Sequence, residues 1–331
     1  MAAARPQFIH ITWQNHAGRA EEMAAALGGQ AVHIHPRALS GRRFTLLRYA
    51  VSLVLTVAAL VRLLPRSVAV VNPPVFPGVV VTVWSAATRT PFLLDSHTGS
   101  FGVKGDGVAR RLLPVHRWMA RRAAAVMVTT QSWVEEVERW GARGIVVHEA
   151  PPVGGQLPQP PPRTRPQVLF PGVFAGDEPV AELVAAAALV PEVDFAITGD
   201  LARCPEGLRE QAPDNVRFVG FLGPADYRRA VLESTALVAL TTEPTSVMRC
   251  AYEAVYAGRQ LVISDWPTLR EVFPHGHHVP NTPDGLAAGV RAAVGGAADE
   301  QRTDALQARE AQLARWGSQL DRMREQLDLP A

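Results

Sequence analysis

Two runs of alternating strand-like and helix-like segments, separated by a proline-rich stretch, constrain the fold of this chain more than any other feature. The stretch Pro151–Pro166 holds seven prolines and two adjacent glycines. It can form neither a helix nor a central strand, and it predicts a semi-rigid linker. The predicted strands are Phe8–Thr12, Ala31–His35, Val68–Val71, Phe92–Leu94, Ala125–Thr129 and Ile145–His148 before the linker, and Val168–Pro171, Asp194–Thr198, Val216–Val219, Leu237–Thr241 and Gln260–Ser264 after it.

Helix-like segments alternate with these strands, which predicts a mainly parallel sheet covered by helices on each side of the linker. We therefore expect an α/β fold with two doubly wound domains over residues 1–150 and 167–331, joined by residues 151–166. Ligands of such sheets bind beyond the carboxyl ends of the strands, so we expect the site in a cleft between the domains. The predicted helices are Gly18–Leu27, Arg48–Leu63, Pro77–Ala87, Val108–Ala123, Ser132–Trp140, Pro179–Leu189, Tyr227–Glu233, Thr245–Ala257, Leu286–Val294 and Glu300–Leu327.

The charge of the chain is nearly balanced, with 33 Lys and Arg residues against 31 Asp and Glu residues. A nucleic-acid-binding protein would usually carry a large basic excess, so we expect no nucleic-acid partner. The two cysteines, Cys204 and Cys250, have the spacing of neither a disulfide framework nor a metal site. Residues 1–7 lack the apolar stretch of a secretory signal peptide. A cytoplasmic location is therefore expected.

The longest apolar stretch, Tyr49–Val61, lies between Arg48 and Arg62. As a helix it would span about 20 Å, which is shorter than the roughly 30 Å of hydrocarbon in a bilayer. We expect a helix in the core of the first domain rather than one that crosses a membrane. The alternative is a helix that lies in a membrane surface beside anionic headgroups. Basic residues that would support this alternative are Arg37, Arg42, Arg43 and Arg48.

The segment Leu237–Asp265 carries the strongest sign of ligand binding. A strand leads into a polar loop, and a helix is expected to open near Ser246. The amide groups of its first turn and the helix dipole would form an anion site, to which Arg249 could add a positive charge. Glu253, seven residues beyond Ser246, could accept both hydroxyls of a ribose. In the alternative interpretation Ser246 only caps the helix and Glu253 is a solvated helix residue.

This second half of the chain resembles the nucleotide-sugar domain of group 1 glycosyltransferases, which have the B-type fold of two Rossmann-like domains. The resemblance rests on Glu253-Ala254, Ala257-Gly258, the strand Leu261–Asp265, Phe195–Gly199, Asn215–Leu222 and Pro171-Gly172, in the family's order. It implies that these segments hold the diphosphate, ribose and base of the donor. The implied donor-binding residues are Gly172, Gly199, Gly220, Phe221, Thr245, Ser246, Val247, Met248, Arg249 and Glu253.

The first half has a narrower likeness, carried by Asn72-Pro73-Pro74 and Asp95-Ser96-His97. It resembles the eukaryotic β-mannosyltransferase that elongates chitobiosyl-diphosphodolichol, and bacterial relatives that act on lipid-linked sugars. The resemblance implies that Asn72 lines the cleft and that His97 faces the donor sugar or the acceptor hydroxyl. An imidazole at the end of a strand could take a proton from that hydroxyl, and His97 and Asp95 are the candidate catalytic residues. The alternative is that both only tie their loop together.

The loop after the first strand is a second candidate for acceptor binding, because this loop often meets the acceptor in the resembling family. Its candidate residues are Asn15, His16, Gly18 and Arg19. Arg19 could instead form salt bridges at the start of a helix. An NAD dehydrogenase is disfavoured because no Gly-x-Gly-x-x-Gly follows the first strand.

The chain also departs from the resembling family. Members often carry a second glutamate where this chain has Thr245, and a basic residue where Phe174–Glu178 offers none. We expect Arg249 to supply the missing positive charge instead. These departures leave inversion or retention open at the sugar.

We expect a glycosyltransferase that moves a sugar from a UDP- or GDP-linked donor to an acceptor hydroxyl, on a glycan or lipid-linked precursor of the cell envelope. No Asp-x-Asp occurs, so we expect no metal and no cofactor; helix amides and Arg249 would stabilise the leaving diphosphate. A cytoplasmic enzyme with peripheral contact to the inner membrane face would fit. Two alternatives are a nucleotide-sugar epimerase or hydrolase on the same fold and a non-catalytic nucleotide-sugar-binding subunit.

Overall fold

The computed structural model describes residues 5–15, 17–39, 41–102, 107–152, 165–296 and 298–330. The chain divides into two compact units, Met1–Val153 with Arg315–Ala331, and Gly154–Ala314. Each unit contains one six-stranded sheet, and its strands pair in parallel. The expected α/β fold of two doubly wound sheets is confirmed. Most of the predicted linker, residues 153–164, lies outside the described residues.

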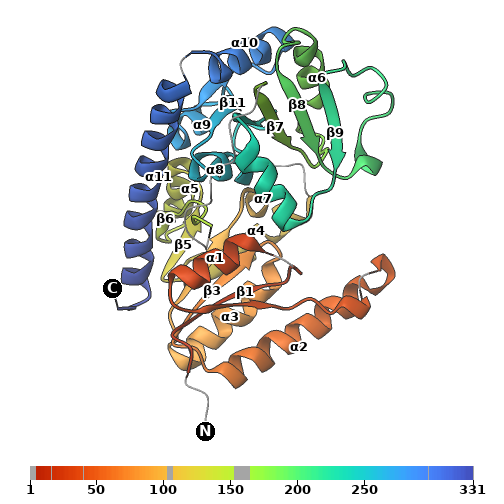
Figure 1. The fold of residues 1–331 in the computed structure, drawn as a ribbon. Coiled ribbons are helices and arrows are strands. Elements are labelled where there is room, and N and C mark those ends of the chain that lie inside the picture. Colours follow the sequence, from red (N-terminus) through yellow and green to blue (C-terminus); the bar gives the residue numbers. More distant parts are fainter. Residues whose placement is uncertain are drawn as a thin grey trace. The chain divides into compact units, whose positions relative to one another are not determined.

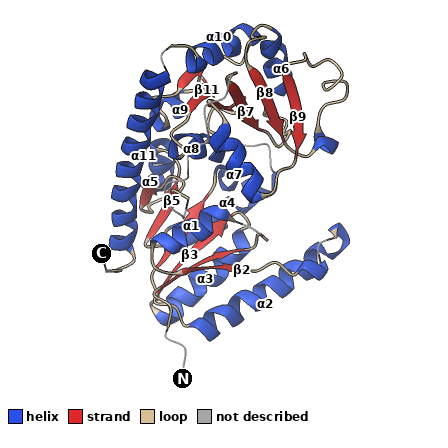
Figure 2. Cartoon of the chain, in the orientation of Figure 1, coloured by secondary structure: helices blue, strands red, loops and turns tan. Residues whose placement is uncertain are grey.

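The sheet of the first unit has the strand order β2-β1-β3-β4-β5-β6 (Figures 1 and 2). Neighbouring residues on its central strands face opposite sides, so Phe8 and Leu93 enter one core while Ile9 and Phe92 enter the other. Helices α2 to α5 cover one face, and α1 covers the other. The bounds are β1 (Phe8–Thr12), α1 (Gly18–Ala26), β2 (Gln30–His33), α2 (Thr45–Leu63), β3 (Ser67–Asn72), α3 (Val75–Thr88), β4 (Phe92–Ser96), α4 (Gly107–Ala120), β5 (Ala125–Val128), α5 (Gln131–Arg139) and β6 (Gly144–Val146).

The sheet of the second unit has the order β12-β11-β10-β7-β8-β9. One of its faces packs against α6 and α10, and the other packs against α7, α8 and α9. The inner strands β7, β8, β10 and β11 are buried on both faces, which explains why the sequence shows short apolar runs here rather than alternation. The bounds are β7 (Gln167–Pro171), α6 (Val180–Ala188), β8 (Asp194–Thr198), β9 (Val216–Gly220), α7 (Pro224–Glu233), β10 (Ala236–Ala239), α8 (Arg249–Tyr256), β11 (Gln260–Ser264), α9 (Pro267–Val272), β12 (His277–Val279), α10 (Pro283–Val294) and α11 (Ala298–Gln326).

The last helix, α11, departs from the expected domain boundary. Leu313, near its middle, packs on the core of the second unit. Trp316, Met323 and Leu327 are instead buried in the core of the first unit with α1. The assignment of the whole C-terminus to the second domain is therefore corrected, because residues 315–331 belong to the first unit.

Helix α2 also differs from the expected core helix. It runs over Thr45–Leu63, 19 residues, which corresponds to a length of about 28 Å. The apolar stretch Tyr49–Val61 alone was expected to span about 20 Å. Its buried residues are Ser52, Thr56 and Leu60, whereas its other leucines and valines point largely to solvent. Among the described residues, α2 is the one helix that is long and apolar enough to cross a membrane, judged by length and composition only.

Candidate functional site

Three glycine turns meet at the carboxyl ends of β7, β8 and β9. A Cβ on Gly172 would lie 3.2 Å from the carbonyl oxygen of Thr198, and one on Gly199 would lie 2.8 Å from the carbonyl oxygen of Gly172. Gly199 N–H donates to the Gly220 carbonyl over 3.1 Å. Since Gly199 has φ +135° and Gly220 φ +78°, both turns favour glycine. The structure therefore brings together Gly172, Gly199 and Gly220, which are three of the predicted donor-binding residues.

Phe221, which follows these turns, leaves 84% of its surface exposed. A large aromatic ring at a strand's carboxyl end is a flat apolar surface on which a nucleobase can stack. The segment Asn215–Leu222, which resembles the family's base-binding segment, thus contains a residue suited to that contact.

The loop between β10 and α8 is longer than expected. Helix α8 begins at Arg249 with Met248 as its N-cap, so Thr245, Ser246 and Val247 lie in the loop. Ser246 N–H closes a turn by donating to the Glu243 carbonyl over 3.1 Å, and it does not cap the helix. The prediction of a helix from Thr245 is corrected. The amide groups that a first helical turn presents to an anion belong to the turn that starts at Arg249.

Glu253 is held by two partners on the second unit. Its Oε1 accepts from Arg249 Nε over 2.9 Å, and its Oε2 accepts the hydroxyl of Tyr227 from α7. Burial and the Glu253 carboxylate raise the pKa of Tyr227 far above its usual range, so the phenol keeps its proton and donates. The carboxylate is fixed in one orientation and retains lone pairs for further donors, such as ribose hydroxyls. Sequence reasoning missed Tyr227, because no local pattern links positions 26 residues apart.

The loop after β7 is closed by its own acidic residues. Glu178 accepts from the backbone N–H of Val173 over 3.0 Å and of Ala175 over 3.3 Å. Asp177 accepts from the Thr241 hydroxyl over 3.0 Å, which ties this loop to the one after β10. Burial raises the pKa of Glu178. Burial also raises the pKa of Cys250, and the negative charges of Glu253 and Glu178 raise it further, so both carboxylates lie near the first turn of α8.

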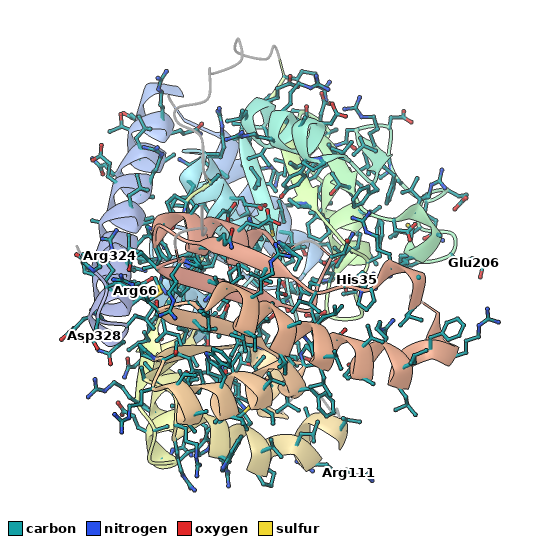
Figure 3. The ribbon with its side chains drawn as sticks, turned by 90° about the horizontal axis from the view of Figure 1, so that it is seen from below. His35, Arg66, Arg111, Glu206, Arg324 and Asp328 are labelled. Carbon is teal, nitrogen blue, oxygen red and sulfur yellow. The ribbon has the colours of Figure 1, made fainter. Side chains whose placement is uncertain are left out.

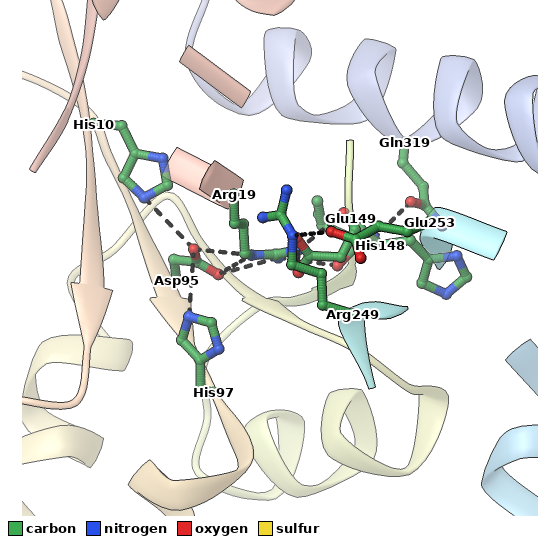
Figure 4. A network of polar contacts seen from close by, with 10 residues as sticks. His10, Arg19, Asp95, His97, His148, Glu149, Arg249, Glu253 and Gln319 are labelled. Carbon is green, nitrogen blue, oxygen red and sulfur yellow. Dashed lines mark hydrogen bonds and ion pairs between the residues drawn. The ribbon is translucent and has the colours of Figure 1, made fainter. Parts of the chain in front are cut away.

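The first unit holds a buried ion cluster around Asp95, at the end of β4 (Figure 4). The Arg19 guanidinium contacts the Asp95 carboxylate at 3.1 Å and Glu149 at 3.0 Å, and it also donates to the backbone carbonyls of Val147 and His148. Burial raises the pKa of Asp95, but Arg19 and two histidines outweigh burial and hold that pKa well below its usual range. Asp95 is therefore a fixed anion rather than a proton acceptor.

Two histidines share that anion. His10 on β1 is fully buried with its Nε2 3.5 Å from Asp95 Oδ2, and His97 Nε2 lies 3.9 Å from the same oxygen. The His97 side chain is 42% exposed, so it alone of the pair can meet a ligand. The geometry suits a base that gains a proton and is then stabilised by a fixed carboxylate. His10 was not predicted, since a histidine within an apolar strand gives no separate signal.

The residues that were predicted to bind the acceptor lie in different surroundings, some buried and some exposed. Asn72 ends β3 and is buried, and its Nδ2 has no hydrogen-bond partner among the described residues, which suits contact with a polar ligand. Asn15 is exposed and accepts from Arg37 Nε over 3.2 Å, and Gly18 opens α1. Arg19 is buried in the ion cluster, so the salt-bridge alternative describes its position. His16 lies outside the described residues.

Comparison with known families separates the same two parts of the chain. Residues 1–152 match the glycosyl transferase 4-like domain, and residues 165–295 match the glycosyl transferases group 1 domain. A search of curated proteins gives no match. Among the residues that the structure describes, no group of three or more His, Cys, Asp or Glu side chains could hold a metal ion.

Solved structures with this fold match nearly the whole chain. Sucrose-phosphate synthase from Thermosynechococcus elongatus has 17% identity and a TM-score of 0.71, covering 96% of this chain and 97% of that one. HepE of Anabaena in complex with UDP-glucose has 16% identity and a TM-score of 0.70, covering 97% and 99%. A glycosyltransferase from Rickettsia africae has 15% identity and a TM-score of 0.64, covering 97% of both chains. At these identities the likeness shows the B-type fold. With both halves matched by glycosyl transferase domains, the chain belongs to the group 1 glycosyltransferases and is a glycosyltransferase.

Proposed function

We infer that the enzyme transfers a sugar from a UDP- or GDP-linked donor to an acceptor hydroxyl without a metal ion or cofactor. The observation that carries this inference is the fixed Glu253 on α8, held by Arg249 and Tyr227. It would bind the ribose, the first turn of α8 the diphosphate, and Phe221 the base. A UDP-glucose complex exists for HepE, which shares the fold.

The proposed step is an exchange of one bond at the anomeric carbon of the donor sugar. The acceptor oxygen forms a bond to the anomeric carbon while the bond from that carbon to the diphosphate oxygen breaks. Amide groups of α8 and the Arg249 guanidinium stabilise the charge that develops on the diphosphate. In an inverting reaction His97 takes the acceptor proton, and Asp95 stabilises the resulting imidazolium. In a retaining reaction the leaving diphosphate takes that proton.

The acceptor is proposed to be a lipid-linked or cell-envelope glycan precursor, met at the inner face of the membrane. The Asn-Pro-Pro loop at Asn72 and the Asp-x-His loop at His97 support this class by their likeness to enzymes of lipid-linked sugars. The buried amide of Asn72, which has no hydrogen-bond partner in the described part of the chain, supplies a donor for an acceptor oxygen.

Product formation from a panel of UDP-, GDP- and dTDP-sugars, with and without polyprenyl-linked acceptors, tests this function. Transfer that needs an acceptor and persists in EDTA is expected with at least one UDP- or GDP-sugar. Donor turnover without an acceptor would instead indicate a hydrolase or epimerase, and nucleotide binding with no turnover would indicate a binding subunit. Loss of transfer in EDTA would contradict metal independence.

The Glu178→Gln substitution is expected to tighten UDP or GDP binding by about threefold, since it removes a negative charge near the proposed diphosphate site. Glutamine can still accept hydrogen bonds from the loop amides. Isothermal titration calorimetry at low and high salt would show a gain that shrinks as salt rises. Glu182→Gln on α6 is the matched control. Equal or weaker binding with an unchanged melting temperature would contradict the proposed position of the diphosphate.

A further inference from the structure

The outer face of α2 is apolar, and no element among the residues that the structure describes covers it. Leu46 is 87% exposed, Val54 is 68% exposed and Val61 is 56% exposed. These residues and Val57 lie on one side of the helix, because their spacings of three, four, seven and eight residues bring side chains onto one stripe. A contiguous exposed stripe of this kind marks an interaction surface.

The inner face of α2 is fixed to the first unit from Tyr49 to Leu60. The Trp13 indole donates to the Thr56 hydroxyl over 3.0 Å, and Leu60 is buried in the core. Tyr49 packs edge-on between Trp13 and Phe76, with ring centroids 5.4 Å and 5.3 Å away. A helix held in this way lies flat on its own domain, so it does not stand across a bilayer.

The positive charge around this face favours an anionic partner. The sequence from residue 23 to residue 94 contains seven arginines and no Asp or Glu. Arg43 precedes the apolar stripe, and Arg62 and Arg66 follow it; all three are exposed. Arg66, and Arg111 of α4, lie at the surface of this unit (Figure 3). A second copy of this basic face would be repelled, whereas anionic headgroups would be attracted and arginine stems can reach them from an embedded helix.

We propose that α2 docks in the surface of an anionic bilayer, with Leu46, Val54, Val57 and Val61 among the acyl chains and the flanking arginines at the headgroups. This docking deepens the proposed function and rests on its lipid-linked acceptor. It would bring the unit that carries His97 to the membrane where such an acceptor lies. Binding to vesicles is measured without nucleotide, so it can fail or succeed independently of sugar transfer.

The test is co-sedimentation of the full chain with vesicles of phosphatidylcholine alone and of phosphatidylcholine with phosphatidylglycerol. The variant Leu46→Gln, Val54→Gln, Val61→Gln should lower partitioning to the anionic vesicles by about tenfold or more. The variant Arg43→Ser, Arg62→Ser, Arg66→Ser should lower it by a similar factor and weaken its dependence on salt. Matched controls are Val108→Gln and Leu189→Gln, which replace exposed apolar residues outside α2.

Unchanged partitioning in the glutamine variant, or no binding of the unaltered chain to anionic vesicles, would overturn the proposal. A dimer in analytical ultracentrifugation that the glutamine variant dissociates would assign the face to a second copy instead. Resistance of the membrane-bound chain to extraction with alkaline carbonate would indicate a spanning helix and would also overturn it.

Discussion

Replacing Glu253 with Ala is expected to weaken binding of UDP or GDP by about tenfold or more. Hydrogen bonds to a charged group contribute about 1.5–3 kcal/mol each, and the proposed ribose contact uses this carboxylate. The change also leaves Arg249 and Tyr227 without the acceptor that fixes them. Isothermal titration calorimetry with each nucleotide measures the effect.

The control for this variant is Asp226→Ala, which removes a carboxylate that pairs with Arg229 at the surface of α7. It should bind nucleotide as the unaltered enzyme does. Tyr227→Phe retains the Glu253 charge and removes one hydrogen bond, so it should produce a smaller loss than Glu253→Ala. Unaltered affinity in Glu253→Ala, with the melting temperature of the protein preserved, would contradict the ribose assignment.

Replacing Arg19 with Met is expected to lower the free energy of unfolding of the first unit by about 3–5 kcal/mol, the range for breaking a buried ion pair from one side. The side chain would leave the buried Asp95 carboxylate and the Val147 and His148 carbonyls without the guanidinium. Urea unfolding followed by circular dichroism would show the loss.

Adding Asp95→Asn to Arg19→Met should restore part of the lost stability, because it removes the uncompensated charge; the two changes should therefore not be additive. Arg139→Met, which breaks an exposed pair with Glu136 on α5, is the control and should cost about 1 kcal/mol or less. A cost of that small size in Arg19→Met would show that the cluster does not stabilise the unit.

Most strands and the two α/β units could be predicted because buried parallel strands appear as short β-branched runs between turn residues. Strand β12 and helix α9 were not predicted, because each is too short for its sequence to show a periodic pattern of apolar residues. The end of α11 was assigned to the wrong unit, because an amphipathic helix does not reveal which core its apolar side meets. Helix α2 was expected in a core, since apolar content alone does not tell an inward from an outward face.

The candidate site could be predicted only in part. The glycines at 172, 199 and 220 end strands that lie together in one sheet, so their proximity follows from topology. The contact of Tyr227 with Glu253, the closure of the β7 loop by Glu178 and the sharing of Asp95 by His10 and His97 depend on side-chain packing between distant segments. The spacing of residues in the sequence does not predict such contacts. The start of α8 at Arg249 was missed because Ser246 closes a turn in the loop where a cap was expected.

A crystal structure of the enzyme with UDP or GDP tests the central claim most directly. The account predicts diphosphate density within hydrogen-bond distance of the amide groups that open α8 at Arg249, with the ribose hydroxyls on the Glu253 carboxylate. Nucleotide density at any other place on the second unit, or none at concentrations where calorimetry detects binding, would contradict it.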